Sequence, residues 1–157
     1  MKKAESKMVK INTKDLTKEA PRSPHERLGG FVILPRSIDK CRATLAGKNG
    51  EYHYNCALDK TFMTFKGIDA EELKKFIATG ASDEAILAWV KEHGIPRTEP
   101  EIKAWSDKSD AENYVSKPDS KKWLEGENKR LGLPNDGTLF DYLDADDKVS
   151  FTNSCQI

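Results

Sequence analysis

The stretch Phe31–Leu45, "FVILPRSIDKCRATL", joins a strongly apolar start to a highly charged second half. On a helix with about 100° per residue, one face is apolar throughout. It carries Phe31, Leu34, Ile38, Cys41 and Leu45. The opposite face carries Arg36, Asp39 and Lys40, with Arg42 at its margin. The first half is apolar on every side, so it is predicted to run through the protein core.

Pro35 interrupts this run and predicts either a kink or a restart of the helix. Two interpretations of the charges that follow remain open. In the first, the helix leaves the core and its charges are solvated, with Asp39 pairing locally with Arg36 or Arg42. In the second, the kink turns the charged face toward a cavity, where guanidinium groups could hold a carboxylate or a phosphate in a bidentate manner.

The composition favours a single cytoplasmic domain. The chain has 157 residues, enough to bury a core without disulfides, and its 26 basic residues balance its 26 acidic ones. Such a balance argues against a general nucleic-acid binder, which needs an uncompensated basic surface. No window approaches a membrane span, and no apolar segment follows the N-terminal lysines, so neither membrane insertion nor secretion is expected. The three cysteines are spaced irregularly and do not indicate a disulfide framework.

Helix start and stop signals punctuate the rest of the chain. Capping boxes or N-caps are predicted at Ser23 with Glu26, at Asp69 with Glu72, at Ser82, at Thr98 with Glu101, and at Thr138 before a last short helix. Gly80 and Gly94 are each predicted to end a helix. A further helix is expected over about 120–131. Only "EYHYN" (51–55) has any strand character.

These signals predict an all-α fold, a single compact bundle of about six helices. Its first long helix would be kinked and partly buried, and an irregular loop would follow it. Residues 1–12 are predicted to form a mobile basic arm, residues 13–151 the helical domain, and residues 152–157 a tail.

The predicted loop after the charged helix is rich in chemically capable side chains. Its candidate ligand-binding groups are Tyr52, Tyr54 and Asn55, and its candidate catalytic groups are His53, Cys56 and Asp59. His53 could act as a general acid or base oriented by Asp59, and Cys56 could be a nucleophile beside a cation. The alternative is that the two tyrosines are packing groups and that Cys56 is a buried structural thiol. His53 and Cys56 alone do not make a metal site, so neither a metal nor another cofactor is expected.

A set of residues in the first half of the chain is typical of one known family. These positions are Pro21, Arg22, Ser23, Pro24, Leu28, Gly29, Arg36, Ile38, Asp39, Lys40, Arg42, Ala43, Leu58 and Asp59. On these residues the chain resembles the bacterial family described as domain of unknown function 5069. The resemblance spans about Asp15 to Phe151, nearly the whole chain, and is most specific in the first half. The resemblance implies a small, mostly helical protein and implies no activity.

Two functional hypotheses follow. In the first, the charged helix and the loop after it form a pocket for a small anionic metabolite. The ligand would be held by Arg22, Arg36, Lys40 and Arg42, and Asp39 would orient an arginine. The protein could then be a metal-independent enzyme. This hypothesis requires Arg36, Asp39 and His53 to converge on one pocket. In the second, the protein is a non-catalytic helical interaction protein, a homodimer or an adaptor.

Overall fold

The computed structural model describes residues 11–111, 118–132 and 138–154, and the chain in these ranges is mainly helical. It contains two short strands, β1 (Arg27–Leu28) and β2 (Phe31–Val32). These are followed by seven helices: α2 (Leu34–Leu45), α3 (Ala57–Lys66), α4 (Ala70–Ile77), α5 (Asp83–Glu92), α6 (Glu99–Ala111), α7 (Pro118–Arg130) and α8 (Leu139–Ser154). Most of the basic arm predicted for residues 1–12 lies outside the described residues.

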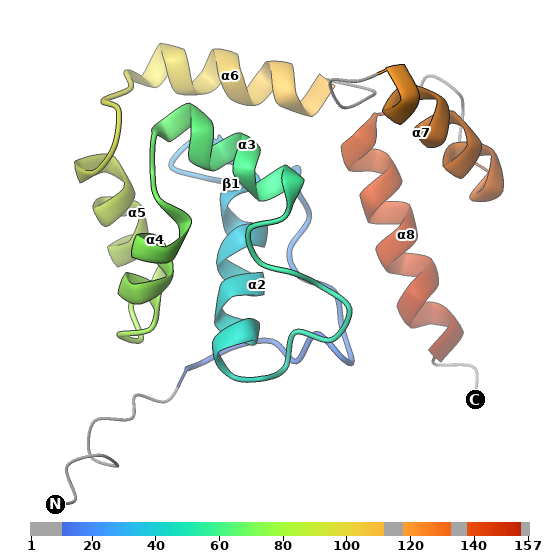
Figure 1. Ribbon diagram of the computed structural model, residues 1–157, viewed down its shortest axis with the longest axis horizontal. Coiled ribbons are helices and arrows are strands. Elements are labelled where there is room, and N and C mark those ends of the chain that lie inside the picture. The colour runs from blue at the N-terminus through green and yellow to red at the C-terminus, as the bar shows by residue number, and fades with distance from the viewer. Residues whose placement is uncertain (1–10, 112–117, 133–137, 155–157) are drawn as a thin grey trace, which may run out of the picture.

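Helix α2 lies in the middle of the molecule (Figure 1). Helices α4 and α5 lie on one side of it, α8 lies on the other, and α6 spans one end between α5 and α7. Helices α3 and α4 both contact α2, and α7 contacts α8. The charged helix is therefore the central element of the fold.

A tight hairpin leads into α2. Strands β1 and β2 are antiparallel, with Leu28 opposite Phe31, and the turn between them consists of Gly29 and Gly30. Both glycines have positive φ, +59° and +89°, as a two-residue hairpin turn with two left-handed residues requires. A β-carbon on Gly29 would lie 2.5 Å from Leu87 Cδ1, so the turn also packs closely against α5.

Pro35 begins α2 instead of kinking it. It lies in the first turn of the helix, where its missing N–H needs no partner, and Ile33 before it has a φ of 74°. The kink predicted at Pro35 is therefore not confirmed. The helix predicted after Ser23 is wrong, because the Ser23 hydroxyl accepts a hydrogen bond from the His25 N–H within a turn that leads into β1.

Three of the predicted helix starts are confirmed in detail. The Asp69 carboxylate caps α4, the Ser82 hydroxyl caps α5, and Thr98 forms a reciprocal capping box with Glu101 at α6. Helix α8 follows Thr138 as expected but has 16 residues, longer than predicted. The loop after α2 consists of turns and irregular backbone, so the strand considered at "EYHYN" is absent.

The sequence analysis missed the β1–β2 hairpin, since it placed Phe31 and Val32 in a helix, and it also missed helix α3. Its N-cap is Cys56, an unusual capping residue, and the carboxylate of Asp59 accepts hydrogen bonds from the backbone N–H groups of Asn55 and Cys56. Gly67, with a φ of 68°, ends the helix in the left-handed conformation. Asp59 and Gly67 are the two sequence signals that could have revealed it.

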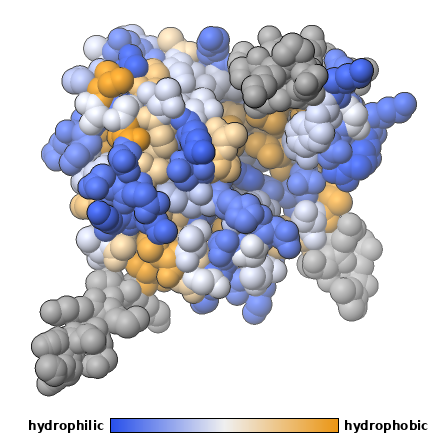
Figure 2. Space-filling model, in the orientation of Figure 1, coloured by the Kyte–Doolittle hydropathy of each residue, from blue (hydrophilic) through white to orange (hydrophobic). Residues whose placement is uncertain are grey.

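The hydrophobic core forms around α2, and its residues come from most elements. Phe31, Ile38, Phe62, Leu73 and Ile86 are fully buried within it. The face shown in Figure 2 is mainly hydrophilic, with small and separate hydrophobic areas. Among the described residues, no helix combines the length and the apolar character that crossing a bilayer requires.

Candidate functional site

The charged half of α2 is buried, and its charges are paired with groups from distant segments. Arg36, Asp39 and Lys40 are only 4%, 6% and 3% exposed. Neither a solvated face nor local pairing of Asp39 with Arg36 or Arg42 is observed. The charges instead connect α2 to the segment before β1, to α3 and to α8.

Asp39 binds Arg22, which precedes β1. Its carboxylate accepts from the Arg22 backbone N–H at 2.8 Å and from the Arg22 guanidinium at 3.0 Å. Arg22 also donates to Asp83, at the start of α5, and Arg42 reaches the same carboxylate at 3.0 Å. Burial lowers the pKa of Arg22, but the hydrogen bonds to Asp83 and Asp39 outweigh that effect and raise its pKa. These ion pairs form one continuous chain from Asp39 through Arg22 and Asp83 to Arg42.

Arg36 binds Asp147 of α8. The guanidinium lies 2.9 Å from the carboxylate, which also accepts a hydrogen bond of 2.7 Å from the Tyr52 hydroxyl. The Arg36 guanidinium stands 5.6 Å from the centre of the Tyr52 ring. Burial and then the hydrogen bond to Asp147 raise the pKa of Tyr52 above its ordinary value. Tyr52 therefore acts here as a neutral hydrogen-bond donor.

A third cluster surrounds Asp59, which is fully buried. Its carboxylate lies 2.9 Å from the Lys40 ammonium and accepts a hydrogen bond of 2.5 Å from the Ser37 hydroxyl. The Lys40 ammonium also lies 3.2 Å from the Cys56 sulfur. The structure thus brings together the predicted site residues Lys40, Cys56 and Asp59.

Other predicted site residues lie apart from these clusters. His53 is exposed and has no hydrogen bond or ion pair within the described part of the chain. The Tyr54 hydroxyl donates to the carbonyl of Ala70 at the start of α4, and Asn55 contributes its backbone N–H to Asp59. No described contact joins His53 to Arg36 or Asp39.

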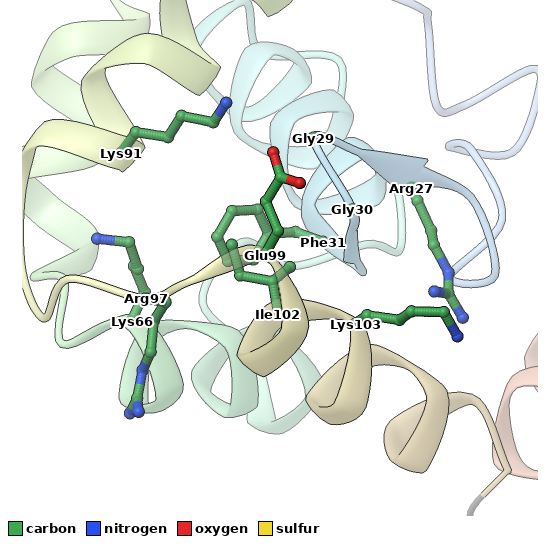
Figure 3. Close-up of a pocket in the computed structure, with 10 residues that line it drawn as sticks. All are labelled: Arg27, Gly29, Gly30, Phe31, Lys66, Lys91, Arg97, Glu99, Ile102 and Lys103. Carbon is green, nitrogen blue, oxygen red and sulfur yellow. The ribbon is translucent and has the colours of Figure 1, made fainter.

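A separate cleft of about 640 Å³ carries an excess of basic side chains. It lies where the hairpin turn meets the ends of α3 and α5 and the start of α6 (Figure 3). Its lining consists of Arg27, Gly29, Gly30, Phe31, Lys66, Lys91, Arg97, Glu99, Ile102 and Lys103. Five of these residues are basic and one is acidic.

Three cations of the cleft form no ion pair with a carboxylate among the described residues. The Lys66 ammonium donates to the carbonyl of His93, the Arg97 guanidinium donates to the carbonyl of Phe65 at 2.9 Å and lies over its ring, and Lys91 has no ion pair. Lys66 is 2% exposed, and burial followed by repulsion from Arg97 lowers its pKa. The cleft therefore retains uncompensated positive charge.

The other charged residues of the cleft are Arg27, Glu99 and Lys103. Arg27 and Lys103 share Asp107, at 2.9 and 2.6 Å. Figure 3 shows the Glu99 carboxylate between Lys91 on one side and Arg27 and Lys103 on the other. The charged ends of Lys66 and Arg97 point away from Glu99, so they act on the cleft through their field rather than by direct contact.

Close backbone contacts hold the cleft walls in place. The Ile95 N–H donates to the Lys66 carbonyl at 2.6 Å, which ties the chain after α5 to the end of α3. Between them, Gly94 has a φ of 70°, and a β-carbon there would lie 2.1 Å from the Lys66 carbonyl oxygen. Glycine is therefore required at this crossing.

The sequence analysis did not find this cleft. Its basic residues come from β1, the end of α3, the end of α5 and the start of α6, and no short motif contains them.

The comparison with known protein families places the chain in one family and assigns no activity. A family model described as "Domain of unknown function (DUF5069)" matches residues 18–149, which is most of the chain. The chain belongs to this family, as the resemblance indicated. No curated protein matches it.

Proposed function

We propose that the protein binds a small anionic ligand with an apolar body in the basic cleft. The proposal rests on one observation: Lys66, Lys91 and Arg97 form no ion pair with a carboxylate in the described chain, and they line the same cleft as the apolar side chains of Phe31 and Ile102. Positive charge beside an apolar surface matches a molecule that carries a carboxylate or phosphate on a hydrocarbon body. A volume of about 640 Å³ suits a metabolite rather than a macromolecule.

The proposed ligand is a small anion, as the sequence analysis predicted, but the proposed site is the basic cleft and not the charged face of α2. On α2, Arg36, Lys40 and Arg42 already bind the carboxylates of Asp147, Asp59 and Asp83. A ligand anion there would have to displace these groups and leave buried carboxylates unpaired, which is costly. Lys91, in contrast, can accept an anion without breaking an ion pair.

Glu99 narrows the ligand class further. Its carboxylate lies among the cations of the cleft and has no hydrogen bond to another described residue. The Glu99 carboxylate would repel a second anionic group at that position, and it would accept a hydrogen bond from a hydroxyl or amino group of the ligand. The described lining contains no thiol, hydroxyl or imidazole side chain, so the proposal is for binding and not for covalent catalysis.

Isothermal titration with phenyl phosphate, inorganic phosphate and benzyl alcohol tests this function. Phenyl phosphate should bind most tightly, because it alone combines the anion with an apolar body. Lys91→Gln should weaken its binding about tenfold, the effect of losing one charged hydrogen bond. Lys108→Gln is the matched control, since Lys108 is an exposed lysine of α6 outside the cleft. Equal affinities of the two variants, or no binding of phenyl phosphate, would contradict the proposal.

A further inference from the structure

Two opposite charges at the basic cleft, Lys91 and Glu99, form no ion pair with each other or with another described residue. Lys91 lies in the last turn of α5, and Glu99 is the first residue of α6. Both side chains are exposed, and both line the cleft together with the apolar Phe31 and Ile102 (Figure 3). The cleft therefore presents an ammonium and a separate carboxylate to a molecule that enters it.

Separate backbone contacts hold the two helix ends that carry these charges. At the start of α6, the Thr98 N–H donates to the Glu101 carboxylate at 2.8 Å, and the Glu101 N–H donates to the Thr98 hydroxyl. Just after α5, the Ile95 N–H donates to the Lys66 carbonyl. The separation between these helix ends is therefore set by the fold. A ligand with two complementary charges can span it without moving the backbone.

The cleft as a whole favours a ligand with net negative charge. Arg27 and Lys103 share the carboxylate of Asp107, and Arg27 also lies 3.7 Å from Asp110. Even with both of these carboxylates and Glu99 counted, the basic groups at the cleft outnumber the acidic ones. A phosphate monoester carries close to two negative charges at neutral pH, so it remains anionic when the same molecule bears one ammonium group.

We propose that the ligand of the basic cleft carries a primary ammonium group in addition to its anion, as an aminoalkyl-substituted aromatic phosphate does. This inference rests on the function proposed above and adds the charge that Glu99 selects. The ligand anion faces Lys91, and the ligand ammonium donates to the Glu99 carboxylate. A hydroxyl group also donates, but it leaves the charge of Glu99 uncompensated near the ligand anion. Glu99 is therefore a specificity-determining residue of the cleft.

Isothermal titration with three phosphates of nearly equal size tests this inference on the full chain. The probes are the phenolic phosphates of para-ethylphenol, tyrosol and tyramine, which differ only in whether the ethyl arm ends in hydrogen, hydroxyl or ammonium. Tyramine phosphate should bind about fivefold more tightly than either of the others, the effect of one partly exposed ion pair. If tyramine phosphate binds no more tightly than both other phosphates, the requirement for an ammonium is overturned and the binding function stands. If none of the three binds, the proposed function fails and this inference fails with it.

Glu99→Gln separates charge selection from a general loss of binding. The substitution should weaken the binding of tyramine phosphate and tighten that of para-ethylphenyl phosphate, because it removes a charge that attracts the ammonium and repels the anion. Damage to the fold would weaken both, so opposite changes identify the role of the carboxylate. Glu84→Gln is the matched control, since Glu84 is an exposed residue in the first turn of α5 outside the cleft and should leave both affinities unchanged. Changes of the same sign for both phosphates in Glu99→Gln would reject the role of Glu99.

Discussion

At the scale of single residues, the fold depends on buried charges that meet partners far along the chain. Arg36 and Asp147 are separated by 111 positions, and Arg22 and Asp39 by 17. Each pair offsets part of its desolvation cost through several hydrogen bonds to the same carboxylate. Removing one member therefore costs more than the pair contributes, because the other member remains buried and unpaired.

Arg36→Ala should destabilise the protein strongly. The substitution leaves Asp147 near a cavity without its guanidinium, and breaking a buried pair in this way costs about 3–5 kcal/mol. For a chain of this size the melting temperature should fall by about 10 °C. Thermal unfolding followed by circular dichroism measures the change. Arg130→Ala is the control: Arg130 forms an exposed pair with Glu127, so its loss should leave the melting temperature nearly unchanged. Equal melting temperatures for the two variants would mean that Arg36 is not structurally required.

The residues whose roles could be predicted from the sequence are those whose partners lie close to them along the chain. Asp69, Ser82 and Thr98 cap helices as predicted, because a cap needs only the next three residues of the chain. Ser23 shows the limit of this reasoning, since the same hydroxyl equally stabilises a turn. The burial of Arg36 could not be predicted, because its partner lies on α8 and nothing near Arg36 in the sequence indicates that contact.

At the scale of elements, α8 is attached to the body of the protein mainly through polar groups. His25, in the turn before β1, contacts Asp110 of α6 at 2.7 Å and Asp141 of α8 at 2.9 Å. The ring of Phe140 packs edge-on against His25, and the Ser23 hydroxyl donates to Asp144. Because each ring nitrogen of His25 faces a carboxylate, only the doubly protonated imidazolium can donate to both.

The attachment of α8 should weaken as pH rises. Burial lowers the pKa of His25, but the hydrogen bond to Asp141 and the charge of Asp110 outweigh it, so its folded pKa lies above the ordinary value. A raised folded pKa adds stability that is complete below the unfolded pKa of about 6.5 and is lost as pH rises through the folded pKa. Burial raises the pKa of Asp141, yet the hydrogen bonds from His25 and Thr138, together with the charge of His25, outweigh burial and lower that pKa. The contribution of Asp141 to the stability of the folded protein is therefore lost only in acid.

Comparison with His25→Gln measures this effect. The melting temperature of the parent should exceed that of the variant near pH 6, and the difference should shrink near pH 9. Glutamine keeps a hydrogen-bonding side chain but cannot carry the charge. A difference that is constant across this range would show that His25 acts through packing alone.

The element scale also shows why the cleft escaped prediction. Helix periodicity places a residue on a face of its own helix, but it does not say which helices meet at their ends. Lys66 and Lys91 lie near the ends of different helices. They line the same cleft only because Gly94 allows the chain after α5 to cross the end of α3. The family model likewise covers these elements and assigns them no role.

At the scale of the whole molecule, the links between α2 and α8 predict one cooperative unit. The tryptophans lie on successive helices, Trp89 on α5, Trp105 on α6 and Trp123 on α7, and can report on each separately. Helix α7 contacts α8, and Phe140 of α8 is buried in the main core. The helices should therefore unfold together, although Trp123 is 52% exposed.

Three variants, each with a single tryptophan and phenylalanine at the other two positions, test this cooperativity. In each variant, the urea midpoint from tryptophan fluorescence should coincide with the midpoint from far-ultraviolet circular dichroism. The comparison is made within one variant, so stability lost through the substitutions does not affect it. An earlier fluorescence midpoint in the variant that keeps Trp123 would instead place α7 and α8 in a separate unit.

The distance along the chain between Arg36 and Asp147 has a consequence for biosynthesis. A ribosome releases α2 long before it has made α8, so the buried arginine has no carboxylate from α8 while the chain is growing. The central helix then carries an uncompensated cation next to apolar surface, and the native core cannot close around it. The native core should therefore close only after α8 has left the ribosome, and until then the growing chain exposes apolar surface for longer than a bundle assembled from neighbouring helices would.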